Sequence, residues 1–195
     1  MTKIIQILNQ NLLDSIQAKN TLLKDKKQIS LFEKAVEKVI SCYRAGGRIY
    51  IAGNGGSAAD AQHLAAEFVS KLSKDREPLA AEALTVDTSV LTAIGNDYGY
   101  DKIFARQIQG KLTKDDIFLG ITTSGNSINI IKALEVCNQM KIPSIVFSGN
   151  GGGEVIDKAD YCIVPPGSRT STIQEIHILL AHSLCECVEK DIFKF

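Results

Sequence analysis

The chain has no excess of charge of either sign, because its 195 residues carry 22 lysines and arginines against 22 aspartates and glutamates. Nucleic-acid-binding domains and membrane-surface patches need clustered basic residues, so this balance argues against both classes of partner. The chain also lacks any apolar run of about 18 residues, the length of a membrane-spanning helix. Its first residues soon meet polar side chains and Asp14, without the small-residue cleavage pattern of a secretory signal. We therefore expect a cytoplasmic protein.

Cysteines are few, and their number and spacing argue against a disulfide framework. There are five, an odd number, and Cys185 and Cys187 project to nearly opposite sides of a predicted helix. Scattered buried thiols in a reducing compartment are the better interpretation. The five are Cys42, Cys137, Cys162, Cys185 and Cys187.

Hydrophobic periodicity predicts helices at the start of the chain and a buried sheet after them. Residues 1–45 show helical stripes that break near 24–27, which predicts two helices. The later apolar, β-branched runs are nearly continuous, which indicates a parallel sheet buried on both faces. We predict one domain over 1–195, a doubly wound α/β sandwich of three layers similar to flavodoxin and Rossmann folds, with a helical N-terminal extension over 1–45. Its five strands are expected near 48–53, 82–86, 116–121, 143–148 and 161–164.

Two transitions from strand to turn to helix are suited to an anion. The first turn is Gly53-Asn54-Gly55-Gly56-Ser57, and the second is Thr122-Thr123-Ser124-Gly125-Asn126-Ser127, before a helix expected over 128–140. Free N–H groups at a helix start favour an anion, and hydroxyls donate to phosphate or sugar oxygens. Glycine and serine also make sharp turns, so either turn alone is compatible with a structural role. Neither is a P-loop, and the first matches a dinucleotide fingerprint only in part.

Two helices carry polar residues that could share a metal ion or a substrate. His63 and Glu67 are four residues apart and lie on one helix face. Gln174 and His182 lie about 80° apart around a helix axis, a gap that a glutamine side chain can close. His177 lies about 140° from His182 and is not included. A histidine on an apolar helix is commonly a hydrogen-bonded core residue, and glutamine is an uncommon zinc ligand, so spacing alone leaves both interpretations open.

Several segments together resemble the phosphoheptose isomerases, a branch of the sugar isomerase (SIS) domain family. They occur in the family's order and are AGNGGSAADAQH at 52–63, IGNDYGY at 94–100, TSGNS at 123–127 and IQEIH at 173–177. The resemblance implies the SIS fold and conversion of sedoheptulose 7-phosphate to D-glycero-D-manno-heptose 7-phosphate. That reaction is the first step towards activated heptose for bacterial surface polysaccharide.

The resemblance also implies a homotetramer whose sites use residues of neighbouring subunits. The leading helices and the C-terminal helix carry more apolar surface than one small sheet can cover, which favours association of helices between subunits. By position, the resemblance assigns substrate binding to Asn54, Gly55, Gly56, Ser57, Glu67, Asn96, Asp97, Thr122, Thr123, Ser124, Ser127 and Gln174, and zinc binding to His63, Glu67, Gln174 and His182.

The chemistry of a ketose-to-aldose isomerisation suits these residues. A proton moves between C1 and C2 through an enediol, which needs a base on carbon and an acid on the neighbouring oxygen. We expect Glu67 to be the base and His182 to be the acid or an oxygen-side shuttle, although the two roles could be exchanged. A divalent ion could polarise the carbonyl.

Two departures from the family pattern leave other functions open. Lys71 and Thr172 stand where arginines are usual, so the substrate could be a different phosphorylated sugar. A relative in this family binds the bacterial replication initiator DnaA as a non-catalytic tetramer, and it lacks the acid and the histidine that are present here as Glu67 and His182. A sugar-phosphate-sensing regulatory domain would keep the two turns without needing those side chains, but no DNA-reading segment accompanies them.

Overall fold

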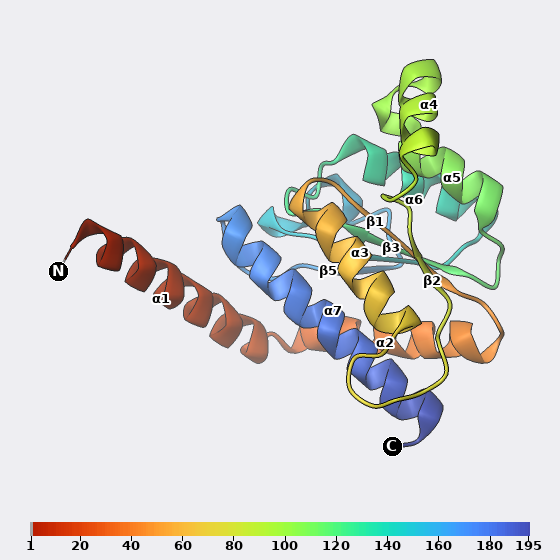
Figure 1. Cartoon of the computed structure of the whole chain (residues 1–195). Helices are drawn as coiled ribbons and strands as arrows, with labels where there is room; N and C mark the ends of the chain where they lie inside the picture. Colours follow the sequence, from red (N-terminus) through yellow and green to blue (C-terminus); the bar gives the residue numbers. More distant parts are fainter. Residues whose placement is uncertain (1) are drawn as a thin grey trace.

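The computed structural model describes residues 2–195 and consists of one parallel sheet between layers of helices (Figure 1). The strand order is β2-β1-β3-β4-β5, and every neighbouring pair is parallel. The predicted doubly wound α/β sandwich with five strands is therefore confirmed. The strands are β1 (Ile49–Gly53), β2 (Ala81–Ala83), β3 (Ile117–Ile121), β4 (Ser144–Phe147) and β5 (Tyr161–Ile163).

Strand β2 is the one that differs most from its predicted range. We expected a strand near 82–86, but its ladder with β1 ends at Ala83, and only the Leu84 N–H, which donates to the Ile51 carbonyl at 2.8 Å, continues the pairing. The central strands β1 and β3 are fully buried, as their continuous apolar sequences predict.

Helices cover both faces of the sheet and create two apolar cores. One core lies between the sheet and helices α2, α3 and α7, and includes Phe68 and Leu184. The other lies between the sheet and helices α5 and α6, and includes Phe104 and Phe118. The helices are α2 (Lys26–Arg44), α3 (Gly56–Val69), α4 (Thr88–Tyr98), α5 (Ile103–Lys111), α6 (Ile128–Met140) and α7 (Thr170–Phe193), with short 3-10 turns η1 (Tyr100–Lys102) and η2 (Asn150–Val155).

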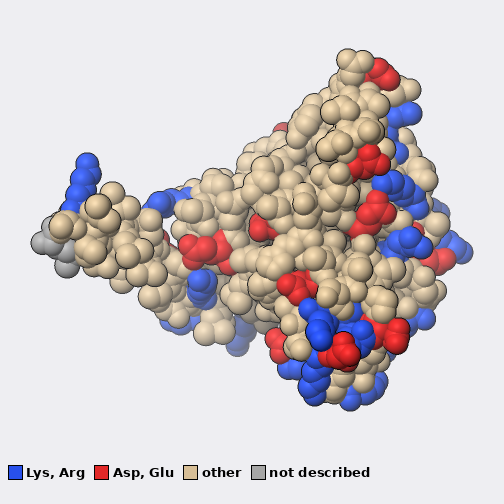
Figure 2. All heavy atoms as spheres, viewed as in Figure 1, with Lys and Arg blue, Asp and Glu red and all other residues tan. Residues whose placement is uncertain are grey.

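The N-terminal extension forms two helices, as its periodicity predicts. Helix α1 (Lys3–Lys24) ends at Asp25, whose carboxylate accepts from the N–H groups of Lys27 and Gln28 at 3.1 Å and so begins α2. Helix α1 projects away from the rest of the molecule (Figure 1). Its apolar side chains are largely exposed, with Ile4 77% and Ile16 56% exposed, and the surface of this end is mostly uncharged in Figure 2 apart from basic side chains near its tip.

The cysteine prediction holds for four residues and is wrong for one. All five are free; Cys42, Cys137, Cys162 and Cys185 are buried, but Cys187 is exposed because it faces away from the core side of α7. Burial raises the pKa of Cys185 to about 12, which keeps this thiol protonated. Among residues 2–195, no helix is both long enough and apolar enough to cross a membrane.

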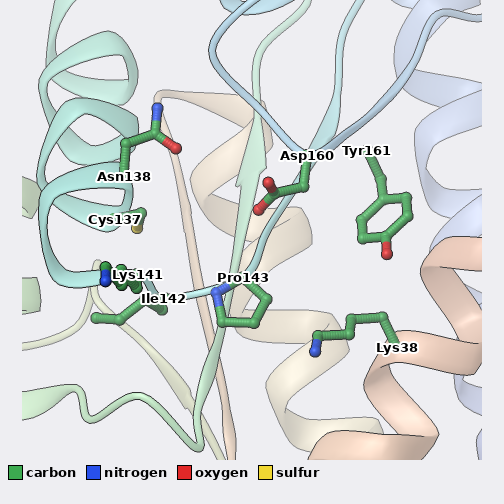
Figure 3. Close-up of a pocket in the computed structure, with 8 residues that line it drawn as sticks. All are labelled: Lys38, Cys137, Asn138, Lys141, Ile142, Pro143, Asp160 and Tyr161. Atoms are coloured by element: carbon green, nitrogen blue, oxygen red, sulfur yellow. The ribbon is translucent and has the colours of Figure 1, made fainter.

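A hollow of about 380 Å³ lies at the amino ends of β4 and β5 (Figure 3). It is lined by side chains that include Lys38 from α2, Lys141 from the end of α6, and Tyr161. None of the predicted site residues lies there, because the two predicted turns follow the carboxyl ends of their strands.

Candidate functional site

The two Gly/Ser-rich turns lie on either side of the point where the strand order reverses. From β1 the chain continues to β2 on one side, whereas β3 pairs with β1 on the other. The turns after β1 and β3 therefore start from neighbouring carboxyl ends. In doubly wound sheets, ligands bind outside the carboxyl ends of the strands at such a point.

The first turn depends on glycine at two positions. Gly55 precedes α3 with a φ of 56°, in the left-handed region that favours glycine. Gly56 lies directly against the side-chain amide of Gln174 on α7, and a Cβ atom at residue 56 would collide with it. Ser57 is buried, and its N–H donates to the Asn54 carbonyl at 3.0 Å. The turn and the start of α7 therefore form one wall of the site.

The side chain of Asn54 is held by two residues that sequence analysis missed. Its amide pairs with that of Asn129 on α6: Asn54 Nδ2 donates to Asn129 Oδ1 at 2.9 Å, and Asn129 Nδ2 donates to Asn54 Oδ1 at 2.8 Å. The Tyr100 hydroxyl also donates to Asn54 Oδ1, at 3.1 Å. Asn129 is only 2% exposed, and a buried polar residue on an apolar helix was the available signal. Tyr100 carried no such signal.

The second turn gathers three hydroxyls at the start of α6. Thr122 Oγ1 lies 2.9 Å from Ser127 Oγ and 3.4 Å from Ser124 Oγ, which in turn accepts from the Asn126 N–H at 3.1 Å. Ser127 is the N-cap of α6, and its hydroxyl makes no capping bond. Hydroxyls and unpaired N–H groups at a helix start together suit a phosphate group. Thr123 is half-buried beside them.

The glycine run at 151–153 supports this second turn. The N–H of Val155 donates to the Gly125 carbonyl at 3.1 Å, and the N–H of Glu154 donates to Asn126 Oδ1 at 2.9 Å. Gly125 has a φ of 68°, and a Cβ there would collide with the Gly152 carbonyl. Sequence analysis found no role for this run, because the packing of one loop on another leaves no periodic signal.

Three of the four predicted metal ligands lie together where α3 and α7 run side by side. His63 Nε2 is 3.0 Å from Glu67 Oε1 and 3.5 Å from His182 Nε2, and one ligand atom from each residue lies within 4.8 Å of the other two. The two histidines direct the same nitrogen at each other. A cation between them satisfies both lone pairs, whereas in a direct contact only one ring can donate.

This donor set fits a zinc ion. Two imidazole nitrogens and one carboxylate oxygen are ligands that zinc accepts, and catalytic zinc sites use three protein ligands and keep a position open. The side-chain amide of Gln174, the fourth predicted ligand, lies against Gly56 at the start of α3. The group is open to solvent in a single chain, since the His63 side chain is 47% exposed and the Glu67 side chain 20%.

His177 belongs to the core rather than to this group. It is fully buried on α7, and its Nε2 lies 2.6 Å from the Ser148 carbonyl, to which it donates. Burial lowers the pKa of His177 to about 4, so the ring is neutral at physiological pH.

Other residues singled out in the sequence make their contacts elsewhere. Asn96 and Asp97 are in the last turn of the protruding helix α4, where Asn96 Nδ2 donates to Asp97 Oδ1 at 2.8 Å (Figure 1). Within residues 2–195, no hydrogen bond or ion pair joins them to His63, Glu67 or His182. Lys71 lies 3.3 Å from Asp75, and Thr172 is buried.

Comparison with known proteins shows which family the chain belongs to. The model of the SIS domain matches residues 13–149. The chain is 54% identical over 180 residues to phosphoheptose isomerase 2 of Campylobacter jejuni, covering 92% of this chain and 90% of the relative.

Solved structures agree over nearly the whole length. The phosphoheptose isomerase GmhA from Neisseria gonorrhoeae superposes with a TM-score of 0.89 at 39% identity, covering 96% of this chain and all of that one. A phosphoheptose isomerase from Francisella tularensis superposes with a TM-score of 0.91 at 35% identity, covering 97% of this chain and all of that one.

Proposed function

The chain belongs to the SIS domain family, and from that membership we propose that it is a phosphoheptose isomerase. The reaction is the conversion of sedoheptulose 7-phosphate to D-glycero-D-manno-heptose 7-phosphate, which supplies heptose for surface polysaccharide precursors. The observation that carries the proposal is the group of His63, Glu67 and His182, brought together from two helices of a fold that also presents two turns suited to an anion.

The second turn is proposed to bind the substrate phosphate. The hydroxyls of Thr122, Ser124 and Ser127 converge there, and the start of α6 provides N–H groups and the positive end of its dipole. The backbone of the first turn, with Ser57, and the pair Asn96 and Asp97 would contact the sugar. The paired amides of Asn54 and Asn129 keep the first turn in one conformation.

The proton transfer is assigned to Glu67 and His182. The Glu67 carboxylate takes a proton from C1, and after exchange with solvent the resulting carboxylic acid delivers a proton to C2. His182 exchanges a proton with the substrate oxygens, and His63 Nε2, 3.0 Å from the Glu67 carboxylate, would share a bound ion with it. Zinc held by His63, Glu67 and His182, with Gln174 as a further ligand, would polarise the substrate carbonyl.

Assembly into a homotetramer is part of the proposal. The exposed apolar side chains of α1 need a partner surface, and another subunit would cover the open side of the His63 group. Sedimentation at micromolar protein should show a tetramer, and a monomer alone would contradict this part. We place the activity in the cytoplasm, where the free thiols stay reduced.

The test is isomerisation of sedoheptulose 7-phosphate followed by NMR in D₂O, with and without added zinc. The wild type should form the aldose with deuterium at C2, and Glu67→Gln should lower kcat by roughly 10²- to 10⁴-fold because it removes the carbon base. Glu186→Gln is the matched control, since Glu186 lies on the surface of α7 and forms an ion pair with Lys190 on the same helix. Loss of turnover in the control but not in Glu67→Gln would contradict the assignment. No turnover by the wild type would direct the search to another phosphorylated sugar.

A further inference from the structure

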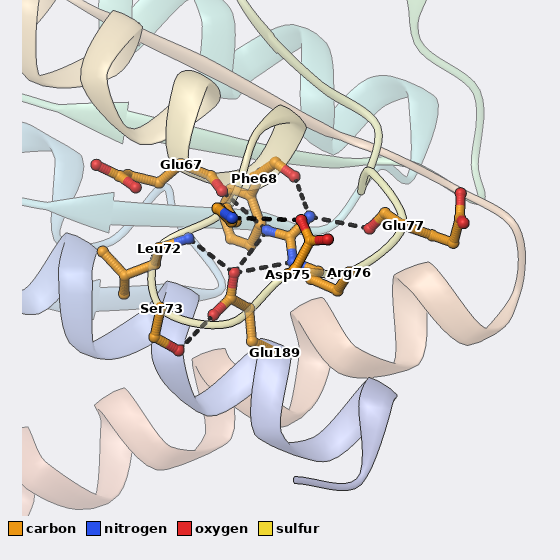
Figure 4. Close-up of polar contacts among 9 residues, drawn as sticks. Glu67, Phe68, Leu72, Ser73, Asp75, Arg76, Glu77 and Glu189 are labelled. Atoms are coloured by element: carbon orange, nitrogen blue, oxygen red, sulfur yellow. Dashed lines mark hydrogen bonds and ion pairs between the residues drawn. The ribbon is translucent and has the colours of Figure 1, made fainter.

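A buried ion pair joins the loop after α3 to helix α7 (Figure 4). Arg76 Nη2 lies 2.8 Å from Glu189 Oε1, and the two side chains are 1% and 0% exposed. The other ion pairs between described residues have partners that are at least 20% exposed. Among residues 2–195, this is therefore the one ion pair in which both side chains are buried.

The Arg76 guanidinium binds the end of α3 at the residue proposed as the carbon base. Its Nη2 donates to the Glu67 carbonyl at 2.8 Å, and its Nη1 donates to the Phe68 carbonyl at 2.7 Å (Figure 4). Both carbonyls belong to the last turn of α3, where helical partners are missing and the helix dipole is negative. A planar fork with several donors can make these bonds at once, and an ammonium group cannot.

The Glu189 carboxylate on α7 binds both Arg76 and the loop after α3. It accepts from Arg76 Nε at 2.8 Å, from the Leu72 N–H at 2.9 Å and from the Ser73 hydroxyl at 3.2 Å. Glu189 is seven residues after His182, so the two side chains lie within about 20° on one face of α7. One cluster therefore binds the backbone of Glu67 and the helix face that carries His182.

We infer that Arg76 and Glu189 are positioning residues that keep Glu67 and His63 on α3 in register with His182 on α7. The inference rests on the proposed function. Desolvation largely offsets the attraction within a buried ion pair, so such a pair adds little stability compared with apolar residues of similar size. What it adds is fixed geometry, and a site that shares one ion across two helices tolerates errors of only about 0.5 Å.

The test separates positioning from stability with two variants and a control. Arg76→Lys keeps the charge but loses the fork, and the double variant Arg76→Met with Glu189→Leu replaces the pair with apolar side chains, so that neither charge is left buried and unpaired. The control is Arg44→Met, which breaks an ion pair between α2 and Asp191 of α7 that does not involve α3. Each protein is measured for melting temperature, zinc affinity by chelator competition, kcat and KM, and by crystallography.

We expect the double variant to melt below the wild type, because the Leu72 N–H and the Glu67 and Phe68 carbonyls lose their partners, but to stay folded at the assay temperature. Folded in this way, it should bind zinc roughly 10- to 100-fold more weakly and lose kcat by a similar factor with little change in KM. Arg76→Lys should also lose zinc affinity and kcat, and the control Arg44→Met should keep wild-type values of both. Wild-type zinc affinity and kcat in the double variant would overturn the inference. A wild type that neither isomerises nor binds zinc would instead overturn the proposed function. In that case crystal structures still test the positioning role. If the distance between His63 and His182 is the same in the double variant as in the wild type, Arg76 and Glu189 do not position the two helices.

Discussion

Replacing Asn129 with alanine should destabilise the protein, because it removes both hydrogen bonds that join Asn129 to Asn54. The two side-chain amides exchange two hydrogen bonds of 2.9 and 2.8 Å, and Asn129 is buried. A neutral hydrogen bond contributes about 1 kcal/mol net, and an unsatisfied buried partner costs about 1–3 kcal/mol. We therefore expect Asn54→Ala, which leaves the buried Asn129 amide unsatisfied, to lower the free energy of unfolding by about 2–3 kcal/mol, and Asn129→Ala, which leaves the half-buried Asn54 amide, to lower it by about 1–2 kcal/mol.

The double variant should lose less than the sum of the two single variants. The coupling energy should be about 1–2 kcal/mol, because the second substitution finds its partner already absent. The assay is urea unfolding of all four proteins at one fixed protein concentration, since an oligomer's stability depends on concentration. Asn138→Ala on the same helix is the control, because its exposed amide donates to the Lys158 carbonyl and takes no part in the Asn54–Asn129 pair. A coupling energy below about 0.5 kcal/mol would refute the reasoning.

Three further predictions concern other parts of the chain. Gly125→Ala should raise KM for the phosphorylated substrate at least 10-fold, because its φ of 68° and the Gly152 carbonyl both oppose a side chain; an unchanged KM in steady-state assays would contradict a phosphate role for this turn. Burial lowers the pKa of His177 from 6.5 to about 4, so the unfolded chain takes up a proton first as pH falls. The neutral His177 ring therefore contributes fully to the free energy of unfolding above about pH 6.5, and this contribution, about 3 kcal/mol, is lost as pH falls from 6.5 to 4. In urea unfolding, His177→Gln should make the free energy of unfolding depend less on pH between 6.5 and 4. The double substitution Leu8→Glu and Leu12→Glu on the exposed face of α1 should shift sedimentation from tetramer towards smaller species without altering the circular dichroism spectrum of the sheet, whereas an unshifted tetramer would exclude α1 from the interface.

Local sequence was sufficient for the fold class and for contacts within one element. Continuous apolar runs such as 117–121 have to be buried on both faces, which is why they predicted a parallel sheet with helices on each side. The four-residue spacing of His63 and Glu67 places both on one helix face, and the structure has them 3.0 Å apart. The end of β2 was less predictable, because a strand's length depends on its neighbour as well as on its own residues.

Contacts between distant segments were decided only by the tertiary structure. His182 meets His63 because α3 and α7 pack side by side on one face of the sheet, and helical periodicity says which face is apolar but not which helix it meets. The pairing of Asn54 with Asn129 depends on the strand order that brings the ends of β1 and β3 together. Arginine and glutamate are seldom fully buried, so nothing in the local sequence marks Arg76 and Glu189 as a buried pair. Their burial follows from the path of the loop across α7, and that path is a property of the whole fold.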